Sequence, residues 1–205
     1  MSKANKSNKA IKYRLYPNNE QKVMFAKTFG CCRFVYNQLL ALQKQRYKDG
    51  ESHLSKLKSN EFATRTLKKD YDFLKEIDKF AVSNAVFHLA DAYDRFFKKQ
   101  NHFPKFKSKR KSKKSYTTNF TNNNILIGKN VIKLPKVGMV KAVIHKLPKD
   151  DWKLKSVTVS QDGVGNYFAS VLFEYEQEDI PSVSKSSTNA IGLDYKSDGL
   201  YMDSN

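Results

Sequence analysis

The hydrophobic pattern of the chain changes its period near residue 100. In residues 80–99, Val82, Val86 and Leu89 recur at three- and four-residue steps, which is the spacing of one face of an α-helix. From Tyr116 onward, short apolar segments alternate with turn-forming residues, a pattern typical of antiparallel strands. These two patterns predict an α+β protein.

A strand is predicted before the first helices. In residues 9–16, Ile11, Tyr13 and Leu15 alternate with Lys12, Arg14 and Tyr16, as in a half-buried strand. Asn18 and Gln21 then have the spacing of a capping box, and a helical pattern continues on both sides of Gly30. We therefore predict two helices that meet at Gly30, in the outline of a helix-turn-helix. Further helices are predicted over residues 51–70 and 80–99.

The strand-like segments after residue 116 fit a small antiparallel barrel or sandwich. They are NILI, VIKL, MVKAVIH, LKSVTVS and YFASVLFEY, separated by turn formers such as those at residues 128–130, 148–150 and 162–163. Residues 181–189 have the low hydrophobicity of a linker. The segments AIGLD and GLYMD beyond it predict two more strands.

The charge of the chain predicts a polyanionic partner. Its 205 residues include 38 Lys and Arg against 20 Asp and Glu, a net charge of +18, while 40% hydrophobic and 13% aromatic residues are enough for a packed core. Of these, 36 basic and 12 acidic residues lie within positions 1–160. The surface that meets the partner is therefore expected within these positions.

Several kinds of site and location are disfavoured. The adjacent residues Cys31 and Cys32 are predicted to be reduced. The chain has no CxxC pair and only 4 scattered histidines, so no zinc site of the Cys/His kind is expected, nor a metal or catalytic role for any of those histidines. No apolar run approaches the roughly 20 residues of a membrane-spanning helix, and the start lacks a secretory signal. We expect a cytoplasmic protein with no membrane partner.

The most basic stretch follows the predicted helix at residues 80–99. Lys98–Lys114 contains nine basic residues and no acidic one. Lys and Arg displace counterions from phosphates, so about six such contacts would give log affinity a slope of roughly −5 against log salt. A solvated linker is the alternative. The candidate nucleic-acid-binding residues here are Lys105, Lys107, Lys109, Arg110, Lys111, Lys113 and Lys114.

Further candidates lie upstream of the basic stretch. Arg14 lies on the first strand, and Arg33, Tyr36 and Asn37 lie in the helical pattern after Gly30. Their side chains could reach base edges or the sugar-phosphate backbone. Core packing is an equal alternative for each residue of that helix. For the aromatic residues Tyr93, Phe96 and Phe97, we predict core packing.

Several segments, in order, resemble one known family. They are KYRLYPNNEQ, FGCCRFVYNQLL, LADAYDRFF leading into FPKFKSKRK, LPKVGMVK, SVTVSQDGVGNYFASVLFE and IGLDYKSDGLYMD. Along nearly its whole length, the chain resembles the N-terminal part of TnpB (OrfB), a transposon-encoded RNA-guided nuclease related to type V CRISPR effectors. This resemblance implies guide RNA and double-stranded target DNA as partners.

The resemblance also implies a domain order, in which a helical recognition domain is inserted into a wedge-type β-barrel and a RuvC-like nuclease domain of RNase H fold begins after it. The expected boundaries are a leader and first barrel strand (1–17), the helical domain (18–103), a basic connector (104–115), the β-barrel (116–180), a linker (181–189) and the first strands of a truncated RuvC-like domain (190–205).

The expected catalytic residue is Asp194 in IGLD, which matches the family's first nuclease aspartate and would be a magnesium ligand. Lys196 stands where the family has a glycine, and Asp198 and Asp203 are expected to be surface turn residues. Two-metal cleavage needs several carboxylates, and the family's later ones have no counterpart. We therefore expect a fragment or truncated copy, inactive alone, with magnesium bound only in a complete catalytic domain. The alternatives are a non-catalytic DNA- or RNA-binding protein acting as a repressor or competitor, and a general RNA-binding basic protein.

Overall fold

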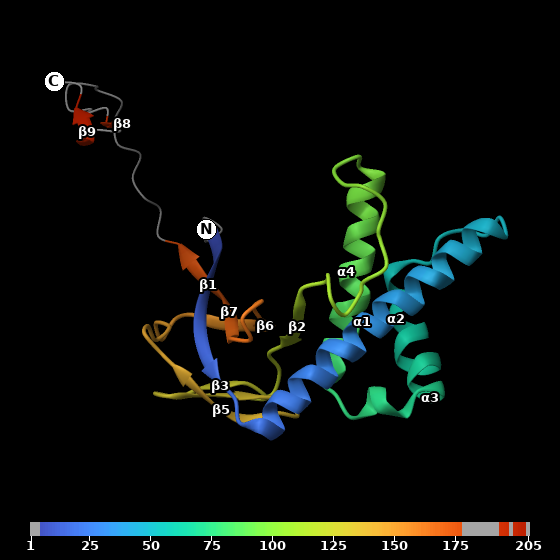
Figure 1. Ribbon diagram of the computed structural model, residues 1–205, viewed down its shortest axis with the longest axis horizontal. Coiled ribbons are helices and arrows are strands. Elements are labelled where there is room, and N and C mark those ends of the chain that lie inside the picture. The colour runs from blue at the N-terminus through green and yellow to red at the C-terminus, as the bar shows by residue number, and fades with distance from the viewer. Residues whose placement is uncertain (1–4, 178–192, 197–198, 204–205) are drawn as a thin grey trace. The chain divides into compact units, whose positions relative to one another are not determined.

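The computed structural model describes residues 5–177, 193–196 and 199–203 (Figure 1). Lys6–Glu176 form one compact unit, which contains the helices and a seven-stranded sheet. A second unit contains a two-stranded hairpin. Within these described ranges, no helix combines the length and the apolar character needed to cross a membrane.

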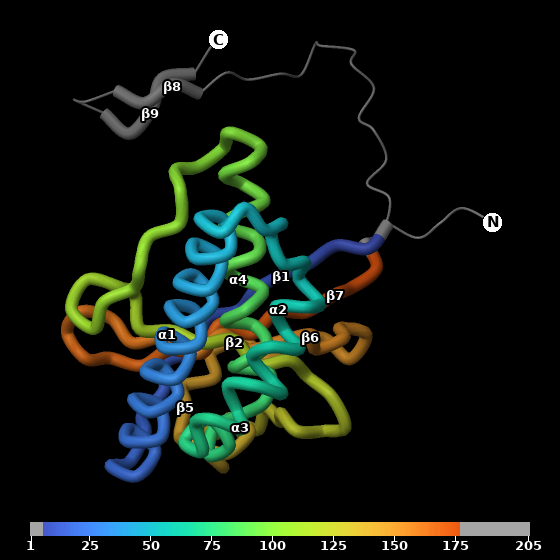
Figure 2. Tube along the Cα trace, turned by 90° about the vertical axis from the view of Figure 1, so that its right-hand side faces the viewer, coloured from blue at the N-terminus to red at the C-terminus, as the bar shows by residue number. Residues whose placement is uncertain are grey.

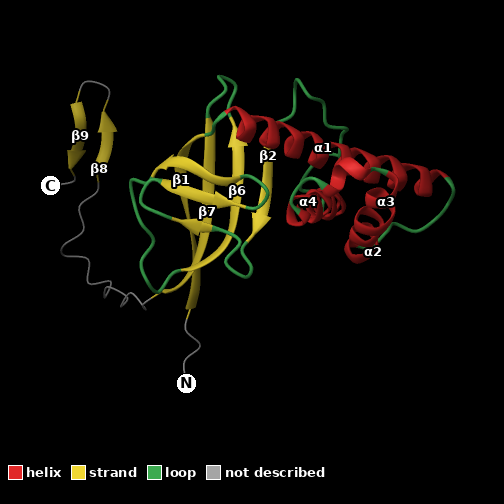
Figure 3. Ribbon diagram, turned by 90° about the horizontal axis from the view of Figure 1, so that it is seen from below, coloured by secondary structure: helices red, strands yellow, loops and turns green. Residues whose placement is uncertain are grey.

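The sheet is built from strands that are far apart in the sequence. Its order is β2-β6-β7-β1-β5-β4-β3, so the first strand of the chain lies in the middle (Figure 3). The pairs β2–β6, β6–β7, β1–β5, β4–β5 and β3–β4 are antiparallel. The strands are β1 (Asn5–Tyr16), β2 (Lys114–Asn119), β3 (Leu126–Ile127), β4 (Val131–Leu134), β5 (Gly138–Val143), β6 (Lys153–Gln161) and β7 (Tyr167–Gln177).

The sheet does not close into the barrel that the sequence predicts. Its two ends are β2 and β3, which do not pair with each other. β3 is only two residues long, too short to extend the ladder. At the other end, helix α4 (Lys79–Phe97) packs against β2, and Asn84 of α4 donates a hydrogen bond to the Thr117 carbonyl oxygen, 2.9 Å away. A helix therefore lies beside β2 where a closed barrel would have a strand.

The first strand has the alternation that its sequence predicts. Ile11, Tyr13 and Leu15 are buried, whereas Lys12 and Tyr16 are exposed. Burial of this apolar face, together with the inward faces of β6 and β7, forms the core of the sheet. The fully buried residues of β6 and β7 are Val157, Val159, Ala169, Val171 and Phe173.

Aromatic side chains join the first helix, α1 (Asn19–Lys48), to the sheet. The ring centroid of Phe25 lies 5.4 Å from that of Tyr167 and 6.3 Å from that of Tyr116. Phe29, one turn further along α1, lies 5.9 Å from Tyr116. Because these rings come from both layers, helices and sheet share one core.

The predicted break at Gly30 is wrong. α1 is a single helix of 30 residues that passes through Gly30, and it begins with the capping box of Asn18 and Gln21. One glycine in a helix costs only about 1 kcal/mol relative to alanine. Buried side chains on both sides, including Phe29 and Val35, offset that cost by packing.

The helical part continues with short elements and one longer helix. Where the sequence predicts a helix over residues 51–70, the chain forms α2 (Lys56–Glu61), a π-helical segment (Phe62–Leu67) and α3 (Lys68–Asp70). A 3₁₀ turn (Asp72–Lys75) precedes α4. α1 and α4 pack against each other (Figure 2).

The predicted α4 is confirmed, but its aromatic end is not all core. Val82, Val86, Leu89 and Tyr93 are buried, as their spacing predicts. Phe96 is half-buried, and Phe97 is 63% exposed. The last turn of α4 thus keeps the helical spacing of apolar residues without burying all of them, so the prediction of core packing is wrong for Phe97.

The second unit contains the hairpin of β8 (Leu193–Lys196) and β9 (Gly199–Asp203), so the two strands predicted there are present. Asp194 lies within β8 opposite Met202, and Asp203 lies within β9 opposite Leu193. Asp203 is therefore a strand residue and not a turn residue. Asp198 and the predicted linker at 181–189 lie outside the described residues. One hairpin does not define a RuvC-like fold.

Candidate nucleic-acid interface

The basic connector, residues 104–115, is fastened to α1 through Asn37. The Asn37 amide nitrogen donates to the Lys107 carbonyl oxygen over 2.9 Å, and the Lys107 main-chain N–H donates to the Asn37 side-chain oxygen over 2.8 Å. Both ends of this amide are therefore occupied. Asn37 positions the connector, a role that its sequence context does not reveal.

Tyr36 is also part of this attachment. Its side chain is 5% exposed, and the Lys107 ammonium nitrogen lies 4.0 Å from the centre of its ring, a cation–π contact. Burial raises the pKa of Tyr36, and burial lowers the pKa of Lys107. Of the two alternatives left open by the sequence, packing is the one observed for Tyr36.

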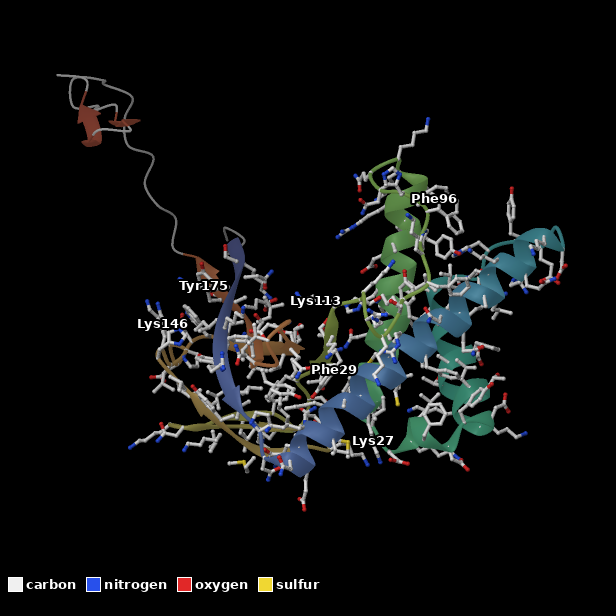
Figure 4. The ribbon with its side chains drawn as sticks, viewed as in Figure 1. Lys27, Phe29, Phe96, Lys113, Lys146 and Tyr175 are labelled. Carbon is white, nitrogen blue, oxygen red and sulfur yellow. The ribbon has the colours of Figure 1, made fainter. Side chains whose placement is uncertain are left out.

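Basic side chains gather in a cleft between α1, α4, the connector and β2. This cationic cleft has a volume of about 120 Å³ and is lined by Arg33, His88, Lys107, Lys113 and Lys114, with no acidic residue among its lining. The apolar part of the lining includes Phe29 of α1 (Figure 4), and Lys113 lies beside β2. The fold thus brings together four of the predicted residues from two separate parts of the chain, α1 and the connector.

His88 is the functional candidate that sequence reasoning missed. It belongs to α4 and lines the cationic cleft. Desolvation and the nearby Lys107 ammonium lower its pKa, against a smaller raising effect from Asp91. The sequence shows only that His88 precedes Leu89, a residue of the apolar face of α4 that the structure buries. That His88 reaches the cleft follows only from the packing of α4 on α1.

Next to the cleft, the connector presents a basic turn. The Ser112 main-chain N–H donates to the Ser108 carbonyl oxygen, and both serine hydroxyls accept hydrogen bonds from main-chain N–H groups of the turn. The side chains within it, those of Lys109, Arg110 and Lys111, are exposed. In the part of the chain that the structure describes, none of the three forms an ion pair.

The remaining predicted residues do not join the cleft. Lys105 is exposed, beside the buried Pro104. Arg14 lies on β1, where it donates a hydrogen bond to Asn166 and its guanidinium lies 5.0 Å from the centre of the Phe168 ring. These contacts hold Arg14 on the sheet.

No metal site forms among the residues that the structure describes. Asp194 and Asp203 are not cross-strand partners in the hairpin, and no group of three or more His, Cys, Asp or Glu side chains that could hold a metal occurs in the described ranges. Cys31 and Cys32 are buried free thiols.

Comparison with known families identifies the N-terminal part of the compact unit Lys6–Glu176. Residues 7–52 match the helix-turn-helix domain of the OrfB_IS605 type. This range covers β1 from near its start and the whole of α1. The class is therefore that of proteins with an OrfB-type helix-turn-helix domain.

Two curated relatives extend the match. The chain is 30% identical over 188 residues to a putative RNA-guided DNA endonuclease of Streptomyces pristinaespiralis, covering 91% of this chain and 45% of the relative. It is 29% identical over 192 residues to the putative RNA-guided DNA endonuclease InsQ of Escherichia coli K12, covering 90% and 44%. The chain belongs to the TnpB/OrfB family, as its sequence motifs predict, and it spans less than half the length of these two relatives.

A third relative is the virulence protein VsdF of Salmonella dublin. It is 32% identical over 111 residues, which cover 49% of this chain and 93% of the relative.

Proposed function

We propose that this chain is the nucleic-acid-binding portion of a TnpB-type RNA-guided DNA endonuclease, which binds guide RNA and target DNA. The observation that carries this proposal is the cationic cleft, where Arg33, Lys107, Lys113 and Lys114 converge without an acidic neighbour in the lining. The names of the two longer relatives support the choice of RNA and DNA as ligands.

The cleft and the basic turn suit a phosphate backbone. A hollow of about 120 Å³ is too small for a typical small-molecule site of roughly 300–1,000 Å³, whereas lysine and arginine side chains at its mouth can neutralise successive phosphates. Such contacts carry affinity and no sequence information. Sequence specificity would come from base pairing between guide and target, as in other guided nucleases.

The nuclease part of the proposal concerns Asp194. Residues 190–205 would begin a RuvC-like domain, with Asp194 as one carboxylate ligand of magnesium in a complete catalytic domain. Bound magnesium would stabilise the attacking and leaving oxygens of phosphodiester hydrolysis. The described residues do not form such a site by themselves.

Binding is tested by fluorescence anisotropy with a structured RNA and with duplex DNA across a series of salt concentrations. We expect both ligands to bind, with log affinity falling linearly as log salt rises. Replacement of Lys109, Arg110 and Lys111 by Gln should make the slope on duplex DNA less steep by about 3. Lack of binding to either nucleic acid at low salt would refute the proposal.

A matched control removes the same charge elsewhere. Lys129, Lys146 and Lys149 are exposed lysines on loops of the sheet, and their joint replacement by Gln should leave the slope close to that of the unmodified chain. A guide-dependent cleavage assay with magnesium distinguishes the nuclease portion from the alternative, a non-catalytic nucleic-acid-binding repressor or competitor.

A further inference from the structure

A second hollow lies at the far end of the helical part, between the C-terminal turns of α1 and α4. This aromatic cleft has a volume of about 600 Å³ and a mainly apolar lining that includes Tyr47, His53, Tyr93, Phe96, Phe97 and Phe103. Phe96 marks it in Figure 4, at the end of α4, whereas Lys113 lies beside β2. The aromatic cleft shares no lining residue with the cationic cleft.

The base of the aromatic cleft is fixed by edge-to-face ring contacts. The ring centroid of Tyr93 lies 4.6 Å from that of His53 and 5.6 Å from that of Phe103. Phe96 lies 5.2 Å from Phe103. Because Tyr93 itself is buried, these contacts tie the cleft to the core, and the site is formed before any ligand arrives.

The mouth of the aromatic cleft keeps large rings in contact with water. Phe97 is 63% exposed and Tyr47 is 85% exposed. Exposed aromatic faces that are grouped around one hollow are a typical feature of binding sites. The Phe97 ring stacks against Tyr93, with the ring centroids 6.1 Å apart, so the exposed part of Phe97 and the ring of Tyr47 are what a flat ligand ring can reach.

Positive charge surrounds these rings. The Lys44 ammonium nitrogen lies 5.5 Å from the centre of the Phe103 ring and 4.8 Å from that of Phe106, and Lys48, one turn further along α1, also lines the cleft. The single acidic lining residue, Glu51, is neutralised by an ion pair with Arg46. The cleft thus favours a ligand that combines a flat apolar ring with a negative charge.

We propose that the aromatic cleft binds an unpaired nucleotide of single-stranded RNA, with its base stacked on the exposed rings and its phosphate beside Lys44 and Lys48. Every base has a π-face that can stack on an aromatic side chain, whereas in a duplex those faces are covered by neighbouring bases. Phe103 in the aromatic cleft and Lys107 in the cationic cleft are four positions apart in the chain. One RNA strand that follows the connector would therefore meet both clefts. This inference rests on the proposed function and names the form of the nucleic acid.

The experiment compares two oligonucleotides with the same number of phosphates, an unstructured RNA and its counterpart with abasic positions. The unmodified chain should bind the base-containing RNA more tightly. Phe97→Ala should weaken binding of that RNA by about tenfold, with no change for the abasic oligonucleotide or in the salt slope. Phe97→Leu should show the same loss, because it retains apolar bulk without an aromatic face, whereas Phe97→Trp should retain the affinity.

Phe120→Ala is the matched control, because it removes an exposed phenylalanine that does not line the aromatic cleft. If Phe97→Ala binds both oligonucleotides like the unmodified chain while the Lys109, Arg110 and Lys111 variant loses affinity, the proposed function stands and this inference is wrong. If Phe97→Ala instead abolishes self-association in sedimentation velocity and leaves RNA affinity intact, the cleft is an interface between copies, which also overturns it. If the unmodified chain binds no RNA, the proposed function itself fails.

Discussion

The side-chain amide of Asn37 is hydrogen-bonded at both ends to the main chain of Lys107, over 2.9 Å and 2.8 Å. Two partly buried hydrogen bonds contribute about 1 kcal/mol each, so Asn37→Ala should destabilise the fold by about 2 kcal/mol in urea denaturation. Because the connector would then lose its position on α1, affinity for nucleic acid should also fall, although no ligand-facing charge is removed.

Asn37→Asp provides the control for this attachment. A carboxylate still accepts from the Lys107 N–H, but it cannot donate to the Lys107 carbonyl oxygen. Its effect on unfolding should lie between that of Ala and that of the unmodified chain. Equal stability of all three chains would show that the two hydrogen bonds do not hold the connector.

Gly30 and Gly138 should respond in opposite directions to replacement by alanine. Gly30 lies inside α1, and a Cβ added there meets no atom within 4 Å, so Gly30→Ala should raise the free energy of unfolding by about 1 kcal/mol. Gly138, the first residue of β5, has φ +82° and equally open surroundings. Gly138→Ala should lower the free energy of unfolding by about 1 kcal/mol, because an L-residue is strained there. Urea denaturation measures both changes, and a destabilising Gly30→Ala would contradict a continuous α1.

A buried hydrogen bond joins the start of α4 to β2. The Thr118 hydroxyl, which is fully buried, donates to the Asp78 carboxylate over 2.6 Å. Thr118→Val keeps the shape but leaves a buried carboxylate oxygen without this donor, so we expect a loss of about 1–3 kcal/mol of stability. A double-mutant cycle with Asp78→Ala should give a coupling energy well above zero.

Thr117 is the matched control for Thr118. Its hydroxyl pairs with that of Thr158 across the sheet, 2.8 Å away in a partly buried position. Since water can partly replace that contact, Thr117→Val should cost less than Thr118→Val. The reverse order would show that the Thr118–Asp78 contact contributes little.

His88 predicts a dependence of stability on pH. Its pKa in the fold is lowered from 6.5 by desolvation and by Lys107, so below pH 6.5 the unfolded chain binds more protons than the folded one. The contribution of His88 is therefore fully present above pH 6.5 and is lost as the pH falls through its lowered pKa. Urea midpoints measured across this range should fall less steeply for His88→Gln than for the unmodified chain, and identical profiles would contradict the lowered pKa.

The two cysteines should react slowly with thiol reagents in the native protein. Burial raises the pKa of Cys32 to about 12, with Cys31 adding to the effect, and burial also raises the pKa of Cys31. Since the thiolate is the nucleophile, Ellman's reagent should label neither residue quickly until denaturant is added. Rapid labelling in native buffer would show that this part of α1 is open.

Local sequence patterns predicted many of the elements because their causes are local. The buried face of β1, the capping box at Asn18 and the apolar stripe of α4 each follow from residues a few positions apart. The same local reasoning failed at Gly30. A glycine lowers helix propensity wherever it occurs, but only the packing around Phe29 and Val35 determines whether the helix continues.

The functional assignments also divide into those that depend on local sequence and those that depend on tertiary packing. The basic character of the connector is a matter of composition, and the family resemblance is carried by segments that can be read in order; both come from the sequence by itself. That Tyr36 is packed, that Asn37 holds the connector, that His88 joins the cationic cleft and that Phe97 is exposed were decided by the tertiary structure alone. Burial and hydrogen-bond partners depend on which distant segments meet, and here α1, α4 and β2 meet across more than 60 positions of chain.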